Sequence, residues 1–145
     1  MQRIERVARV AAIQTALATA ALHLLWAVPR LLEPGSVTDS RPPLFVAVAL
    51  VLVAVAVAVF RSYPYRRLSA LGGGTLATLL VGYVGYHGSN AAELLASDPL
   101  ALAAVAVEAV GVVAFAALYV LHHPDRLGAT PPAGDDADTT KRGDS

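Results

Sequence analysis

The sequence predicts an all-α fold: a polytopic membrane protein built as a four-transmembrane-helix bundle with both termini cytoplasmic. Three observations predict it. First, 56% of the 145 residues are hydrophobic and only 15% are charged, which leaves little polar surface for a soluble domain. Second, the basic residues gather in alternate connections. Third, four apolar runs have about the 17–25 residues that a helix needs to cross a bilayer: 7–28, 44–60, 68–87 and 99–121.

The run 44–60 argues most directly against a soluble helical bundle. Its sequence, LFVAVALVLVAVAVAVF, has no polar side chain on any helical face. A helix on the outside of a small soluble bundle must show one face to water, and this run has no such face. A strand is excluded by the length of the run, and because an open sheet edge is not tolerated in lipid.

The run 7–28 is interpreted as a retained span rather than a cleaved signal peptide. It follows a basic N-terminus, as a signal peptide does. Trp26, Pro29 and Arg30 stand, however, where the small residues of a cleavage site are expected.

The distribution of Lys and Arg predicts the orientation, because cytoplasmic loops carry an excess of these residues. Two of the eleven, Arg30 and Arg41, lie in the 29–43 connection, and the 88–98 connection has none. The other nine fall on the opposite side: Arg3, Arg6, Arg9, Arg61, Arg66, Arg67, Arg126, Lys141 and Arg142. We therefore expect a multi-pass protein of the cell (plasma) membrane with its N- and C-termini inside.

Local signals predict where the elements begin and end. Asp98 before a proline suits the N-cap of the last span. Asn90 followed by Glu93 suits the start of a short surface helix over 91–96. The glycine run 72–74, at the cytoplasmic end of the third span, is expected to weaken that helical turn. It is interpreted as a tight loop exit, with a functional hinge as the alternative.

The chain divides into two parts by composition. Residues 1–123 are expected to form the four-helix transmembrane domain. Residues 124–145 contain almost no apolar side chains, so we expect a disordered, acidic cytoplasmic tail. Arg in place of Lys, together with abundant Ala and Val, suggests a GC-rich genome, and the Asp-rich tail suits a salty cytoplasm.

Small residues predict where helices approach closely, since helices in lipid associate through close packing. The first span carries such residues at Ala12, Ala16 and Ala20. The second span has no polar or glycine stripe, so we expect it to be the most lipid-exposed. The third span places small residues on one face: Gly74, Thr78, Gly82, Gly85 and Ser89.

Four polar side chains form the candidate ligand or proton site, because topology places them in the same outer half of the bilayer: His23, Tyr83, His87 and Glu108. Glu108 is the strongest signal, since an ionisable group deep in the membrane is costly and suggests function. His23 continues a polar helical face that begins with Thr15 and Thr19. Packing remains an alternative for each: a protonated Glu108, a hydrogen-bonded His23, and an aromatic belt at Tyr83 and His87.

Other aromatic and histidine residues have a structural interpretation. Trp26 and Tyr119 are expected to be interfacial anchors. His122 and His123 are expected to cap or to reach the interface at the cytoplasmic end of the last span.

The candidate site suits a proton, a metal, a haem or a quinone head group. Two histidines and a carboxylate can bind a metal, and two histidines on adjacent helices can ligate haem, but neither has a spacing signature here. The absence of cysteine excludes disulfides and thiolate sites. No basic nucleic-acid patch is present, so no nucleic-acid partner is expected.

A second function remains open beside ligand binding. The chain can instead be a structural or assembly subunit of a larger membrane complex or a homo-oligomer, with the polar groups serving helix packing. Whether it is an enzyme is left undecided by the sequence.

Four stretches resemble a known group of proteins. They are HLLWAVPRLLEP (23–34), SRPPLFV (40–46), VGYVGYHG (81–88) and DPLALAAVAVEAV (98–110). In these stretches the chain resembles small four-span haloarchaeal membrane proteins of unassigned function, over about residues 5–121, and its architecture is similar to that of DoxX-like four-helix proteins. The resemblance implies a membrane location and four helices, and it implies no activity.

Overall fold

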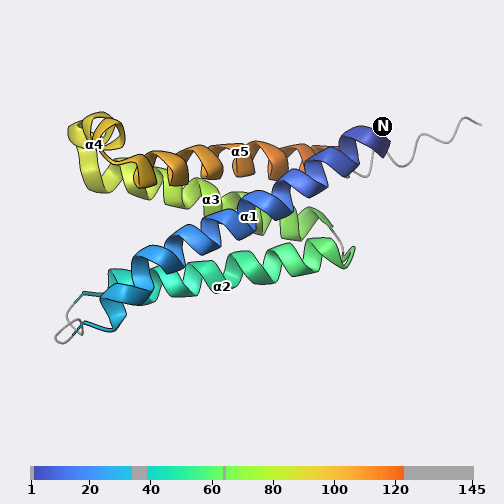
Figure 1. Cartoon of the computed structure of the whole chain (residues 1–145). Coiled ribbons are helices and arrows are strands. Elements are labelled where there is room, and N and C mark those ends of the chain that lie inside the picture. The colour runs from blue at the N-terminus through green and yellow to red at the C-terminus, as the bar shows by residue number, and fades with distance from the viewer. Residues whose placement is uncertain (1, 34–38, 64, 123–145) are drawn as a thin grey trace, which may run out of the picture.

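A computed structural model describes residues 2–33, 39–63 and 65–122. Within these ranges the chain is helical and contains no strand (Figure 1). The elements follow in the order α1 (Gln2–Leu31), α2 (Arg41–Phe60), α3 (Tyr65–His87), the 3₁₀ helix η2 (Gly88–Asn90), α4 (Ala91–Ser97) and α5 (Pro99–Leu121). The predicted tail over 124–145 lies outside the described residues.

Four stretches of these helices are long and apolar enough to cross a membrane: Arg3–Leu31, Arg41–Phe60, Arg66–Ser97 and Pro99–Leu121. This finding confirms the all-α class and the four candidate spans. α1 begins and α5 ends at the same end of the molecule, beside the turn between α2 and α3 (Figure 1). We name this the N-terminal end, and the opposite end, where α4 lies, the α4 end.

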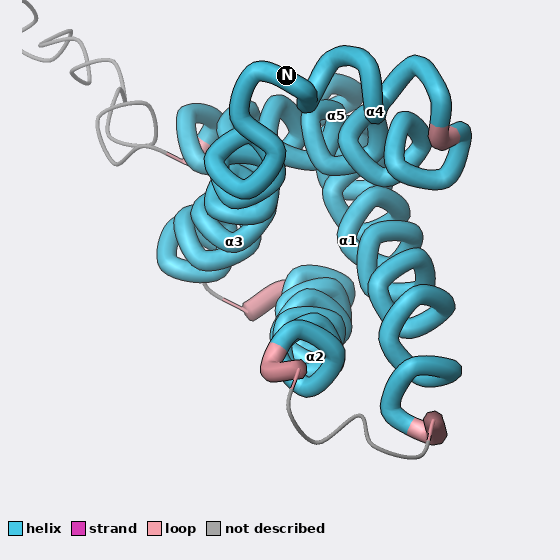
Figure 2. Tube along the Cα trace, turned by 90° about the vertical axis from the view of Figure 1, so that its left-hand side faces the viewer, coloured by secondary structure: helices cyan, strands magenta, loops and turns pink. Residues whose placement is uncertain are grey.

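The helices pack unequally against one another. α1 contacts α2 and α5 extensively, and α3 contacts α5, whereas α2 touches α3 only lightly. The view turned by 90° accordingly shows α2 and α5 on opposite sides of the molecule (Figure 2). The bundle therefore has one weak seam, between α2 and α3.

α1 extends the predicted span 7–28 at both ends, and its first turns are tied to the end of α2. One guanidinium nitrogen of Arg9 donates to the main-chain oxygens of Val59 (2.9 Å) and Phe60 (2.7 Å) and to the Ser62 hydroxyl (2.7 Å). The last carbonyls of a helix have no partner within that helix. Arg9 thus caps the C-terminus of α2, which lies at the N-terminal end of the molecule. This contact adds to the predicted role of Arg9 in orientation.

The two predicted helix starts at the α4 end have different outcomes. The Asp98 carboxylate accepts from the main-chain nitrogens of Leu100 (2.9 Å) and Ala101 (3.2 Å), which confirms it as the N-cap of α5. α4 forms as predicted, but the Asn90 side chain does not cap it. The chain stays in the helical region at Asn90, so the extended conformation of a normal N-cap is missing.

The glycine run 72–74 lies inside α3, so the prediction of a loop there was wrong. A Cβ at Gly72 would lie 2.7 Å from the Phe115 ring. A Cβ at Gly111 would lie 2.5 Å from Leu76 and 3.0 Å from the Thr15 hydroxyl. These glycines therefore let α3, α5 and α1 approach closely.

The predicted small-residue face of α3 does not make such a contact. A Cβ at Gly74, Gly82 or Gly85 would meet nothing within 4 Å. α3 is also less buried than α2. In the most apolar 18-residue stretch of each candidate span, 17% of the residues are buried in the span that contains α3 and 28% in α2. The expectation that the second span is the most exposed was therefore wrong, because its alanines and valines pack on α1.

The core fills the half of the bundle toward the N-terminal end. The predicted close-packing alanines at 12, 16 and 20 are buried, which confirms that face of α1. The largest fully buried apolar side chains are Phe115, Leu52, Leu76, Leu118, Val55 and Val59. The other half, toward α4, holds the polar candidate residues.

A candidate pocket between the four long helices

The four predicted site residues line a single cavity of about 490 Å³. His23 comes from α1, Tyr83 and His87 from α3, and Glu108 from α5. α2 closes the remaining side with Leu44 and Phe45, among others. Side chains that the helices bring from four separate parts of the sequence thus share one pocket, in the half of the bundle toward α4.

His23 and Glu108 face each other in the wall of this pocket. His23 Nε2 lies 3.9 Å from Glu108 Oε1, and the two residues are only 8% and 4% exposed. This distance is longer than a direct hydrogen bond. Both atoms therefore keep hydrogen-bonding capacity for a third atom between or beside them.

The hydrogen bond at His23 Nδ1 determines which hydrogen-bonding roles remain for Nε2, the atom that faces Glu108. His23 Nδ1 lies 2.9 Å from the Thr19 carbonyl oxygen, one turn earlier in α1. A carbonyl oxygen only accepts, so Nδ1 must carry a hydrogen. Nε2 then either has a lone pair and needs a donor, or carries a second hydrogen and the positive charge. Charge balance in a buried site favours one shared proton, on Glu108 or on Nε2.

The other polar residues on this face of α1 differ in their surroundings: Thr15 is bonded to its own helix, Thr19 is buried, and Arg30 is exposed. The Thr15 hydroxyl donates to the Ala11 carbonyl at 2.8 Å. The buried Thr19 hydroxyl has no partner among the described residues. Arg30 is exposed and lies over the Trp26 ring, 4.1 Å from its centroid. His23 is therefore the titratable residue of this face that lines the pocket.

Aromatic rings form much of the pocket wall. Phe45 packs edge-on against His23 (4.8 Å between centroids) and Trp26 (4.9 Å). On the α3 side, the His87 ring lies 4.5 Å from Tyr83 and 4.9 Å from Tyr86. Trp26 is thus part of the pocket, beyond its predicted role as an anchor.

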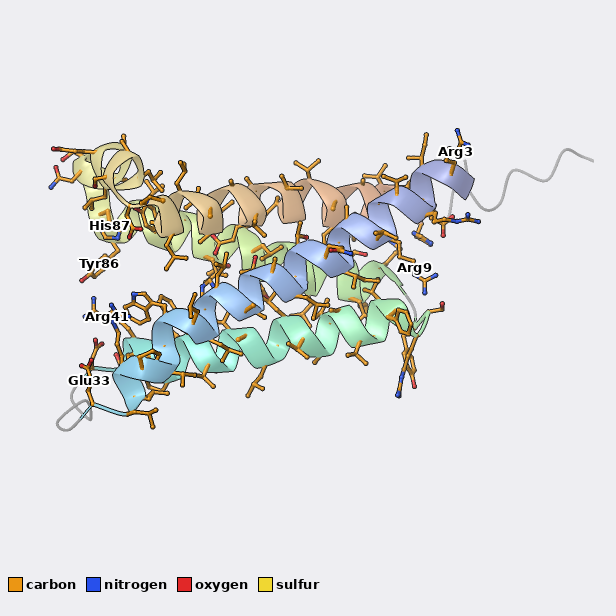
Figure 3. The ribbon with its side chains drawn as sticks, in the orientation of Figure 1. Arg3, Arg9, Glu33, Arg41, Tyr86 and His87 are labelled. Carbon is orange, nitrogen blue, oxygen red and sulfur yellow. The ribbon has the colours of Figure 1, made fainter. Side chains whose placement is uncertain are left out.

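Arg41 joins α2 to α3 at the α4 end of the pocket. Its Nη1 donates to the Tyr86 hydroxyl at 2.8 Å, and its other nitrogens contact the Asp39 carboxylate (Figure 3). These hydrogen bonds from Arg41 hold the pKa of the exposed Asp39 carboxyl below its ordinary value. The contact stabilises folding above the unfolded pKa of Asp39, and this contribution disappears as the pH falls through the folded pKa.

Sequence reasoning missed Arg41 and Phe45 as pocket residues. Arg41 was interpreted as a charge of the outer loop and, with the two prolines after it, as the start of the second span; Phe45 lies in a run without polar residues. The signal that could have found them is the unusual position of Arg41, in front of two prolines at the start of a span. Its long side chain can then reach over the next helix.

The described residues do not fit a metal or a haem well. No three His, Asp or Glu side chains among them converge as a metal site. A haem between His23 and His87 would need a free Nε2 on each histidine. His23 Nε2 instead faces the Glu108 carboxyl group, which occupies the side of the ring where an iron would bind.

A second polar contact lies far from the pocket, at the N-terminal end. His122 Nε2 lies 3.3 Å from Glu5 Oε1, and His122 Nδ1 bonds the Leu118 carbonyl at 2.9 Å. Arg66 donates to the Tyr119 hydroxyl at 3.3 Å. His122 therefore caps α5 as predicted and also links it to α1, while His123 lies outside the described residues.

Comparisons with protein families, with curated proteins and with solved structures find no match for this chain. The resemblance to small haloarchaeal membrane proteins stays a prediction, and the pocket geometry carries the functional argument.

Proposed function

We propose that this chain is a multi-pass protein of the cell membrane that binds the head group of a lipid-soluble molecule of the quinone type. The pocket lies in the half of the membrane away from the cytoplasm, and both termini are cytoplasmic. The distribution of arginines supports this orientation. Arg3 and Arg9 lie at the N-terminal end, and Arg41 lies at the α4 end (Figure 3).

The single observation that carries the proposal is the His23–Glu108 pair in the wall of a pocket. Two ionisable groups inside a membrane helix bundle are costly to keep. A pair that serves packing alone would close to a direct hydrogen bond, whereas this pair is separated by 3.9 Å and lines a cavity. A carbonyl oxygen of a ligand can accept a hydrogen bond from the proton that the pair holds.

The shape and lining of the pocket favour a flat ring. Its volume, about 490 Å³, falls in the range of small-molecule sites. Phe45, Trp26 and Tyr83 offer ring faces and edges on which a planar head group can pack. A quinone ring combines this planar, apolar body with carbonyl acceptors.

Trp26 provides the test, because it is the only tryptophan of the chain and it lines the pocket. Purified protein in mild detergent is titrated with a short-tailed quinone while the tryptophan fluorescence is recorded. We expect saturable quenching at Trp26. A variant with Trp26→Phe and Val113→Trp moves the reporter to an exposed face of α5, where only unsaturable quenching from partitioning is expected.

Equal, unsaturable quenching in both proteins would contradict the proposal. The structural or assembly subunit would then be the better account, with His23 and Glu108 serving only to hold α1 and α5 together.

A further inference from the structure

A second hollow runs beside the pocket, along the weak seam between α2 and α3. It measures about 300 Å³ and is lined by Val48 of α2 and by α3 residues from Ala70 to Leu79. Leu79 also lines the pocket that holds His23 and Glu108. The hollow, which we name the seam groove, therefore adjoins the pocket at this residue.

The seam groove is apolar in spite of its threonines. The Thr75 hydroxyl donates to the Leu71 carbonyl, and the Thr78 hydroxyl donates to the Gly74 carbonyl, each at 2.8 Å. With the hydroxyls bonded to their own helix, methyl groups remain to line the groove. Gly74 adds depth, since a Cβ there would meet nothing within 4 Å.

The direction of the seam groove matches that of a membrane lipid. It runs from the pocket toward the N-terminal end, along the ten residues of α3 from Ala70 to Leu79, or about 14 Å. A molecule with its head in the pocket would thus point its tail away from the α4 end and across the middle of α3. Lipids of the leaflet at the α4 end have the same orientation.

We propose that the seam groove holds the apolar tail of the ligand whose head group binds between His23 and Glu108. The ligand is then a long-tailed amphiphile, such as an isoprenoid quinone, rather than a compact molecule. This inference rests on the proposed function. The buried, ionisable lining of the pocket marks where the head binds, and the light packing of α2 on α3 leaves the groove open to lipid.

The test compares two quinones with the same head, one with a short tail and one with a long isoprenoid tail. The groove is filled by Gly74→Leu together with Thr78→Leu, both at exposed positions. The matched control is Gly85→Leu on the same helix, where a side chain also meets nothing and which lines neither hollow. Affinities are measured by quenching of Trp26, and oligomeric state by size-exclusion chromatography with light scattering.

We expect the wild type to bind the long-tailed quinone more tightly, by about threefold to tenfold, from packing of the tail. Filling the groove should remove this advantage and leave the short-tailed affinity unchanged. The Gly85→Leu control should behave like the wild type.

Equal affinities of the two quinones in the wild type would overturn the inference but not the proposed function. A lost dimer in the filled variant would overturn it too, by showing that a second copy of the chain occupies the groove. Failure of both quinones to bind the wild type would overturn both proposals.

Discussion

Glu108 and His23 form a pair, because their polar atoms face each other in the wall of one pocket. The Thr19 carbonyl fixes the hydrogen on His23 Nδ1, so a pair without net charge carries its other proton either on Nε2 or on the Glu108 carboxyl group. Loss of either partner would leave a buried group without compensation, which costs several kcal/mol. A substitution that keeps size and polarity, such as Glu108→Gln, can preserve the fold because its amide can donate to Nε2.

The sequence predicted the pocket residues that are chemically unusual for a membrane span. Glu108 and His23 stand out because polar groups are rare at their depth. Helix counting places Tyr83 and His87 in the same half of the bilayer. Arg41 and Phe45 could not be found in this way. Their membership in the pocket depends on how α2 is turned toward α3, which no local spacing encodes.

At the scale of helices, glycines decide where close contact occurs. The sequence predicted a stripe of small residues on α3, yet Gly72, outside that stripe, makes the close contact of α3 with Phe115. Gly111 of the last span, also predicted from its size as a site of close approach, does contact Leu76 and Thr15. Spacing alone does not show which face of a helix meets a large side chain such as Phe115. The alanine face of α1 was predictable because it is the uninterrupted small-residue face of that helix.

A comparison of two glycines on α3 tests this account of packing. Gly72→Ala places a methyl group 2.7 Å from the Phe115 ring, and such overpacking costs about 1–3 kcal/mol. Gly85→Ala meets nothing within 4 Å and should gain about 0.5–1 kcal/mol from helix propensity. We expect the melting temperature in mild detergent, followed by circular dichroism, to fall for the first and to stay or rise for the second. Equal shifts would show that α3 and α5 are not in close contact at Gly72.

The molecule as a whole has two unlike halves. The half toward the N-terminal end is filled by a tight apolar core, and the half toward α4 contains the pocket and the start of the seam groove. The apolar core thus lies between the pocket and the N-terminal end. The sequence predicted four spans from hydropathy, but only packing reveals that one half is filled and the other is not.

The arginines predict the orientation of the whole bundle, and the prediction can be tested on a chain that has no cysteine of its own. Single cysteines are placed at Ser89, which is exposed at the α4 end, and at Tyr63, which is exposed in the turn at the N-terminal end. In intact cells an impermeant thiol reagent should label Ser89→Cys and not Tyr63→Cys. Lysed cells serve as the control, in which both should react. The reverse pattern in intact cells would invert the topology and place the pocket on the cytoplasmic side.

The central claim is that the proton held by His23 and Glu108 binds the head group of the ligand, and the pH dependence of affinity tests it most directly. The affinity of the short-tailed quinone is measured by quenching of Trp26 fluorescence in the wild type, in Glu108→Gln, and in the control Glu93→Gln, which removes an exposed carboxylate on α4.

Loss of the shared proton at alkaline pH leaves a carboxylate facing the carbonyl of the ligand. We therefore expect wild-type affinity to fall about tenfold between mildly acidic and mildly alkaline buffer, the value of one charge-assisted hydrogen bond. Glu93→Gln should show the same fall, and Glu108→Gln should bind with an affinity that no longer changes with pH. An unchanged pH dependence in Glu108→Gln would contradict the claim.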